Sequence, residues 1–414
     1  METNFHIAVR FLLAKKRAML MSLSGIIFGV GLFIVTQAQT SGFENFYTHT
    51  ALATDGAIHV EDRFQYTDDP MTVRSASGKS SKISLAKQRR YIPGVQYPDE
   101  MMNALRKFEN INGISPVLRG NVEADSNFRV IPAQIFGIDL DEFLAVSNLG
   151  HQVISGDIED FRNDPNGVVI GSLLAGRLNL EVGDPVVLTQ AGRSDRFRVS
   201  AIFETGVSDI DKERVIAHLP QARAILAQPF AVTYLQASLR DPDRAVADAD
   251  QMQEVLGQIV VPWQEREKIW LGVFAALRFS SALTVSTIIL ISGLGMFNTL
   301  AMIVLEKTRE IAILRSMGYT RRDISQIFLL QGTLVLFAGC VLGCAFGALC
   351  TWLVSTIPMP IRGIFSTDHF VVLWSPWHYV WALIAATFVV LIASWIPARR
   401  AARLEPGDII RSAA

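Results

Sequence analysis

The chain has 414 residues, half of them hydrophobic, and a formal net charge of -1. Because it has no overall basic excess to engage phosphates, a nucleic-acid partner is not expected. The hydrophobic residues are concentrated in four uncharged runs, at residues 18–43, 279–305, 324–361 and 370–398. Each run is long enough to cross a bilayer as a helix, so the composition excludes an ordinary water-soluble protein.

Residues 1–17 carry apolar side chains at helical spacing and end in three basic residues. This pattern predicts a cytoplasmic amphipathic helix that lies on the membrane before the first span. A secretory signal peptide is the weaker alternative, because the apolar run that follows is too long and no small-residue cleavage pattern ends it.

The first span is expected over residues 18–43. It contains Gly25 and Gly29, small residues four apart that allow another helix to approach closely in lipid. Its outer end mixes aromatic and polar side chains, which suits either a substrate groove with an acyl-chain side and a polar side or an ordinary interfacial aromatic belt. The groove candidates are Phe33, Gln37, Thr40, Phe43 and Phe46.

Residues 44–272 form a long polar region that is large enough for one or two hydrophobic cores. Strand-like and helix-like stretches alternate along it, which predicts an α+β domain. All three cysteines lie in the third span, so a disulfide framework is not available to this region. Residues 67–90 are rich in Ser, Lys, Arg and Asp and poor in apolar side chains, so they are expected to form a mobile loop or insertion.

The second span, residues 273–305, is followed by a short charged loop, residues 306–323. Apolar residues recur at helical spacing within this loop, and Gly318 stands where a glycine would end a helix. The loop is therefore expected to form a short helix at the membrane face. A surface helix that only stabilises the hairpin of spans explains the pattern equally well.

The third span, residues 324–357, carries a ridge of small residues formed by Gly339, Gly343 and Gly347. Such a ridge predicts close helix packing, either within the protein or with a second subunit. The remaining segments are an external loop, a fourth span and a cytoplasmic tail, at residues 358–370, 371–397 and 398–414.

Lysine and arginine placement gives the orientation. The amino-terminal segment holds four, the 306–323 loop five and the tail after Pro397 four, whereas the loop between the third and fourth spans holds only Arg362. The positive-inside rule then predicts that both termini and the 306–323 loop are cytoplasmic and that residues 44–272 are periplasmic in a bacterium.

The sequence lacks the patterns of common catalytic and metal sites. Gly78-Lys79-Ser80 resembles the end of a phosphate-binding loop, but Val73 stands where the first glycine is required. His-Glu-x-x-His, paired-cysteine and Gly-x-Ser-x-Gly motifs are absent. The spans also lack buried Asp, Glu, Lys or Arg, which a proton- or ion-coupled transporter would normally use. Neither a catalytic residue nor a metal ligand is predicted, and the energy for any transport must come from elsewhere.

Several stretches resemble one family. EKTREIAILRSMGYTRRDI at 306–324, SWIPARRAARLEPGDIIR at 394–411 and GVVIGSLLAGRLNLEVGDPVVL at 167–188 are similar to permease subunits of type VII ABC transporters, the MacB/FtsX superfamily. IAVRFLLAKKR at 7–17 and SGFENF at 41–46 look closest to the lipoprotein-releasing permeases of the LolC and LolE type. The resemblance implies an α-helical membrane protein with four transmembrane helices and a MacB-like periplasmic domain between the first two.

The resemblance also implies partners. An ABC ATPase on a separate chain, expected as a dimer, would bind ATP and Mg, and this chain would need no cofactor of its own. A second permease subunit, identical or different, would complete the complex. In this family the helix after the second span docks on the ATPase, which maps onto Glu306, Lys307, Arg309, Glu310, Arg315, Met317, Gly318, Tyr319 and Arg321.

The function implied is mechanotransmission: ATP-driven closure would move the external domains and extract or expel a lipoprotein, lipid or peptide at the periplasmic side of the inner membrane. In lipoprotein-releasing relatives the outer part of the first span helps to form the substrate cavity, which favours the groove over the aromatic belt. One alternative is a MacB-type exporter that works with a periplasmic adaptor. The other is an FtsX-like signalling scaffold that controls a cell-wall hydrolase.

Overall fold

The computed structural model describes residues 6–11, 16–62, 71–74, 80–83, 94–95, 97–126, 129–358, 367 and 369–403. These residues divide into two compact units. The helical unit contains the described residues of 1–46, 272–359 and 368–414, and the external unit contains those of 47–271 and 360–367.

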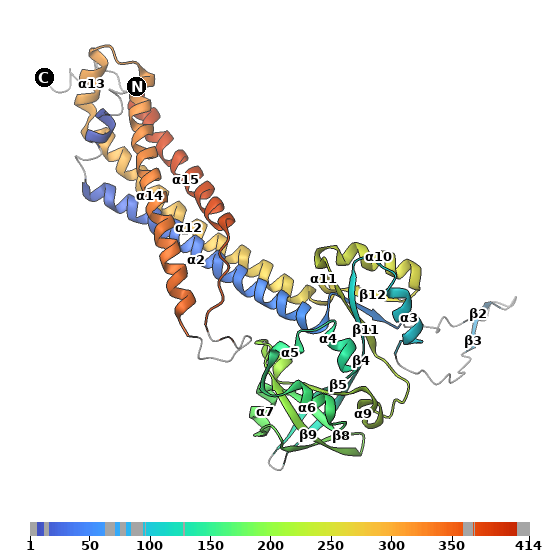
Figure 1. Cartoon of the computed structure of the whole chain (residues 1–414). Helices are drawn as coiled ribbons and strands as arrows, with labels where there is room; N and C mark the ends of the chain where they lie inside the picture. Colours follow the sequence, from blue (N-terminus) through green and yellow to red (C-terminus); the bar gives the residue numbers. More distant parts are fainter. Residues whose placement is uncertain are drawn as a thin grey trace. The chain divides into compact units, whose positions relative to one another are not determined.

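Four long helices are apolar enough to cross a membrane (Figure 1). They form because each uncharged run can bury its backbone polar groups only by helical hydrogen bonding. A further short helix, α13, follows α12. The bounds are α2 Lys16–Asp55, α12 Lys268–Glu306, α13 Thr308–Ser316, α14 Arg321–Thr356 and α15 Pro376–Ala402.

The helix that contains the first span is longer than the span expected over residues 18–43, because α2 continues without a break to Asp55. The extension has its own amphipathic pattern. Tyr47, Thr50, Ala51 and Thr54 are buried at the i, i+3, i+4 and i+7 spacing of one helix face.

Glycines bring α2 close to two other helices. A β-carbon added at Gly25 would lie 2.7 Å from Ser292 Oγ, and one at Gly29 would lie 2.9 Å from Ile289 Cγ1, both on α12. Added β-carbons at Gly339, Gly343 and Gly347 on α14 would lie 2.7, 2.9 and 3.0 Å from side-chain carbons of Ile26, Val30 and Ile34. All five glycines of the predicted ridges therefore stand where helices touch within this chain.

Residues 6–11 are helical and belong to the core of the helical unit. Ala8 and Phe11 are buried there, and Gln331 Nε2 of α14 donates to the Ala8 carbonyl oxygen at 3.5 Å. The expected surface helix is thus packed into the protein along this stretch. The rest of segment 1–17 lies outside the described residues, except for the start of α2.

The external unit is built on a mixed sheet of ten of the described strands. The order is β12-β1-β11-β4-β5-β10-β7-β9-β6, and β8 pairs with β4 and β9. The β10–β5 and β7–β9 pairs are parallel, and the others are antiparallel. The strands are β1 Ile58–Glu61, β4 Ile111–Asp125, β5 Val130–Ile138, β6 Val153–Gly156, β7 Gly167–Gly171, β8 Pro185–Gln190, β9 Arg193–Phe203, β10 Arg214–His218, β11 Tyr234–Leu239 and β12 Ile259–Pro262.

Helices cover both faces of this sheet. Neighbouring strand residues point to opposite faces: Leu118 and Ile135 join one core, whereas Val117 and Phe136 join another. A third core lies around β1, β11 and β12. The helices are α3 Pro98–Leu105, α4 Leu140–Leu144, α5 Leu149–Gln152, α6 Ile158–Asn163, α7 Ser172–Leu178, α8 Ser208–Asp211, α9 Leu219–Ile225, η1 Pro242–Arg244, α10 Ala245–Leu256 and α11 Trp263–Arg266.

The segment expected as a mobile loop, residues 67–90, contains a hairpin. Strands β2 Met71–Arg74 and β3 Ser80–Ile83 pair antiparallel, with Met71 opposite Ile83. The prediction of a loop is therefore wrong for these two strands. The other residues of the segment, and most of the 358–370 loop, lie outside the described residues.

Candidate functional site

The segment between α12 and α14 is a helix with sharply defined ends. Helix α13 ends before Gly318, whose φ of +100° is a conformation that glycine adopts without strain. Thr320 then opens α14 with a capping box: Asp323 N donates to Thr320 Oγ1 at 3.3 Å, and Thr320 N donates to Asp323 Oδ2 at 2.9 Å. These caps fix where the turn between α13 and α14 lies.

One face of α13 packs into the helical core. Ile311 and Ala312 are buried, and Leu314 and Tyr319 pack against the same cluster. Arg315 Nη1 donates to the Ala402 carbonyl oxygen at the end of α15, 3.3 Å away. The helix is therefore held by the bundle and is not a free surface segment.

The opposite face of α13 is exposed and partly apolar. Met317 is 74% exposed and Ile313 is 51% exposed, beside the charged side chains of Arg309 and Glu310. Of the nine residues predicted to contact an ATPase, six are exposed: Glu306, Arg309, Glu310, Met317, Gly318 and Arg321. Lys307, Arg315 and Tyr319 are half-buried, and Lys307 forms an ion pair with Glu310 and lies over the Phe11 ring.

A cavity of about 400 Å³ opens between α2, α12 and α15 of the helical unit. Its walls are largely apolar, with three polar side chains among them, which is the composition of many ligand pockets. Gln37 Nε2 donates to Ser281 Oγ at 3.1 Å, so the Gln37 side chain has a fixed orientation. The lining residues are Phe33, Gln37, Ala282, Ser286, His378, Trp381, Ile384 and Ala385.

The structure brings two of the five predicted groove residues, Phe33 and Gln37, to this cavity. Thr40 instead donates to the Thr36 carbonyl oxygen within its own helix, and the Phe43 ring packs edge-on against Phe370. Phe46 is half-buried three residues further along α2. Sequence reasoning missed the lining residues from α12 and α15, although His378 is the one histidine inside an otherwise apolar span.

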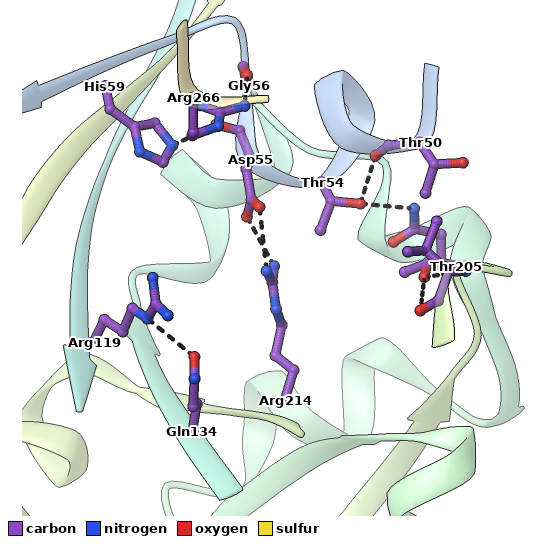
Figure 2. Close-up of polar contacts among 12 residues, drawn as sticks. Thr50, Thr54, Asp55, Gly56, His59, Arg119, Gln134, Thr205, Arg214 and Arg266 are labelled. Atoms are coloured by element: carbon purple, nitrogen blue, oxygen red, sulfur yellow. Dashed lines mark hydrogen bonds and ion pairs between the residues drawn. The ribbon is translucent and has the colours of Figure 1, made fainter. Parts of the chain in front are cut away.

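A second cavity, of about 570 Å³, lies within the external unit. It is lined by charged side chains that the sequence did not single out, among them Asp55, Arg119, Arg214 and Arg266 (Figure 2). Burial, and next the charge of Arg266, lowers the pKa of His59 on its wall to about 3. Among the described residues, no group of three or more His, Cys, Asp or Glu is placed to hold a metal ion.

Comparison with known proteins accounts for most of the chain. Residues 19–255 match the MacB-like periplasmic core domain, and residues 282–406 match the FtsX-like permease C-terminal region. The lipoprotein-releasing system transmembrane protein LolC of Xylella fastidiosa is 26% identical over 98% of both chains. LolE of Haemophilus influenzae is 25% identical over the full length of both chains. The macrolide export ATP-binding/permease protein MacB of Psychrobacter cryohalolentis is 23% identical over 98% of this chain and 59% of that protein.

Proposed function

Because this chain belongs to the family of the MacB-like periplasmic core domain, we propose that it is the permease subunit of an ABC transporter that extracts a lipoprotein from the inner membrane. It would use a separate ATPase subunit and act at the periplasmic side by transmitting movement to its external domain. The observation that carries this proposal is the end-to-end similarity to LolC and LolE, whose names state lipoprotein release.

The exposed face of α13 supports an ATPase partner. A face that combines two exposed apolar side chains with alternating charges is typical of a protein–protein contact, since the apolar centre gives affinity and the charges give orientation. The face of α13 that packs into the helical core ties the same helix to α15 and to that core. A push on α13 would therefore be carried into the bundle. ATP and Mg would be bound by the partner, and this chain would take no catalytic part.

The cavity between α2, α12 and α15 supports an amphipathic substrate. Phe33, Trp381 and Ile384 offer apolar walls to an acyl chain, whereas Gln37, Ser286 and His378 offer hydrogen-bonding groups to a polar end. Both termini and the α12–α14 turn would be cytoplasmic, with the external unit in the periplasm, as the distribution of lysine and arginine favours. The proposal includes a second permease subunit, either an identical copy in a homodimer or a different chain in a heterodimer.

Depletion of the chain in its host tests this function. Lipoproteins destined for the outer membrane should accumulate in the inner membrane fraction. The similarity to MacB favours a second candidate, an exporter that works with a periplasmic adaptor. Normal lipoprotein sorting in depleted cells, together with increased sensitivity to macrolides, would replace the first proposal by the second.

A further inference from the structure

The carboxyl-terminal part of α2, residues 47–55, belongs to the external unit, and an ion pair fixes its end to the sheet. Asp55 is the last residue of α2, and both of its carboxylate oxygens accept from Arg214 of β10, at 2.8 and 3.2 Å (Figure 2). The Arg214 guanidinium also lies 4.1 Å from the centre of the Phe136 ring on β5. A two-point contact of this kind fixes orientation as well as distance.

The chain leaves the external unit through α11, and two further contacts tie α11 to the same end of α2. Arg266 Nη2 donates to the Gly56 carbonyl oxygen at 2.9 Å, directly after the helix (Figure 2). Glu267 accepts from Tyr47 Oη at 2.5 Å and from Arg266 Nε at 3.1 Å. The Tyr47 and Trp270 rings add a contact with their centres 5.3 Å apart. We call Tyr47, Asp55, Arg214, Arg266 and Glu267 the entry clamp.

Local helix stability does not explain this choice of residues. A carboxylate at the carboxyl end of a helix is unfavourable for the helix dipole, and the last turn of α2 has no basic residue to offset it. Burying an ion pair also costs desolvation, so an apolar pair of similar volume would hold the helix at least as firmly. Burial alone would lower the pKa of Arg214, but the Asp55 carboxylate outweighs it and raises that pKa, so the pair stays charged. Its distinctive property is a fixed geometry.

We propose that the five residues of the entry clamp are positioning residues. They hold the segments by which the chain enters and leaves the external unit in fixed positions relative to the sheet, and so pass movement of α2 to the external domain. This role in transport rests on the proposed permease function. An apolar contact could slide under load, whereas the forked ion pair and the shared Glu267 keep α2, α11 and β10 moving as one body.

Hydrogen exchange on the full-length protein in lipid nanodiscs tests whether the clamp acts as one body. Arg214 hydrogen-bonds to Asp55 at the end of α2. If the clamp acts as one body, Arg214→Gln should also raise the hydrogen-exchange rate at least tenfold at the amides of Trp263 and Glu267. The Trp263 amide donates to the Ala57 carbonyl oxygen, and the Glu267 amide donates to the Trp263 carbonyl oxygen. Lys212→Gln, two residues from Arg214, is the matched control, because it removes an exposed ion pair with Asp209. Faster exchange at the end of α2 with α11 unchanged would overturn the proposal.

A transport readout separates transmission from mere stability. Arg214→Lys keeps the charge but loses the fork, and Asp55→Asn keeps the shape but loses the charge, so either serves if Arg214→Gln does not fold. In the complex with its ATPase, these variants should keep ATP hydrolysis but release less than one third as much lipoprotein per ATP. Release at the wild-type ratio would overturn the proposal. Failure of the wild-type complex to release lipoprotein would instead contradict the proposed function, and the exchange result would still stand.

Discussion

At the scale of single residues, His59 makes the external unit sensitive to acid. Its Nε2 lies 2.8 Å from the Asp55 carbonyl oxygen, and its ring stacks on Tyr234. The folded state holds this imidazole neutral, with a pKa of about 3, whereas an unfolded histidine titrates near 6.5. The stabilising contribution is therefore complete above pH 6.5 and is lost as the pH falls toward 3.

We expect the external unit to lose about 2 kcal/mol between pH 7.5 and pH 5 through His59 alone. The measurement is the unfolding free energy of the unit in the detergent-solubilised chain, followed by protease susceptibility at both pH values. In His59→Gln this part of the pH dependence should disappear, whatever the substitution does to stability at pH 7.5. An unchanged slope in the variant would show that His59 is not the group responsible.

At the scale of elements, the contact of α14 with α2 depends on Gly343. An added β-carbon would lie 2.9 Å from Val30 Cβ and 3.3 Å from the Ile27 carbonyl oxygen, and backbone cannot move aside as a side-chain tip can. Gly343→Val should therefore force the helices apart and destabilise the helical unit by roughly 1–3 kcal/mol. Thermal unfolding in detergent measures this. Gly295→Val on α12 is the control, since its β-carbon would meet nothing within 4 Å among the described residues.

The element α13 carries the next prediction. Met317→Asp should weaken association with the ATPase at least tenfold, because a charge would replace the apolar centre of the exposed face, while folding should be unaffected at a side chain that is 74% exposed. Co-purification and equilibrium binding measure the effect. Val255→Asp on α10 is the matched control, with 72% exposure in the external unit. Equal binding by both variants would remove α13 from the ATPase contact.

The elements also show where sequence reasoning succeeds and where it stops. The four long helices could be predicted because uncharged runs are visible locally, and Gly318 marked the end of α13 for the same reason. The continuation of α2 to Asp55 was missed, since the threonines on its buried face hide an apolar periodicity. The Asp55–Arg214 pair and the α12 and α15 walls of the membrane cavity join residues far apart in the chain, which a single sequence does not reveal.

At the scale of the whole molecule, the orientation in the membrane is a prediction from charge placement. In a background without the three native cysteines, Ser194→Cys and Ser316→Cys place exposed thiols on the external unit and on α13. In spheroplasts, an impermeant thiol reagent should label position 194 at once and position 316 only after lysis. Labelling of position 316 in sealed spheroplasts would reverse the proposed topology.

We propose that this chain converts ATP hydrolysis by a partner into release of lipoprotein from the membrane. The most direct measurement reconstitutes the chain, its ATPase and a fluorescent lipoprotein in proteoliposomes, with a soluble acceptor outside. Lipoprotein should appear in the soluble fraction with ATP and stay in the membrane with a non-hydrolysable analogue. ATP hydrolysis at a normal rate with all lipoprotein retained in the membrane would contradict it.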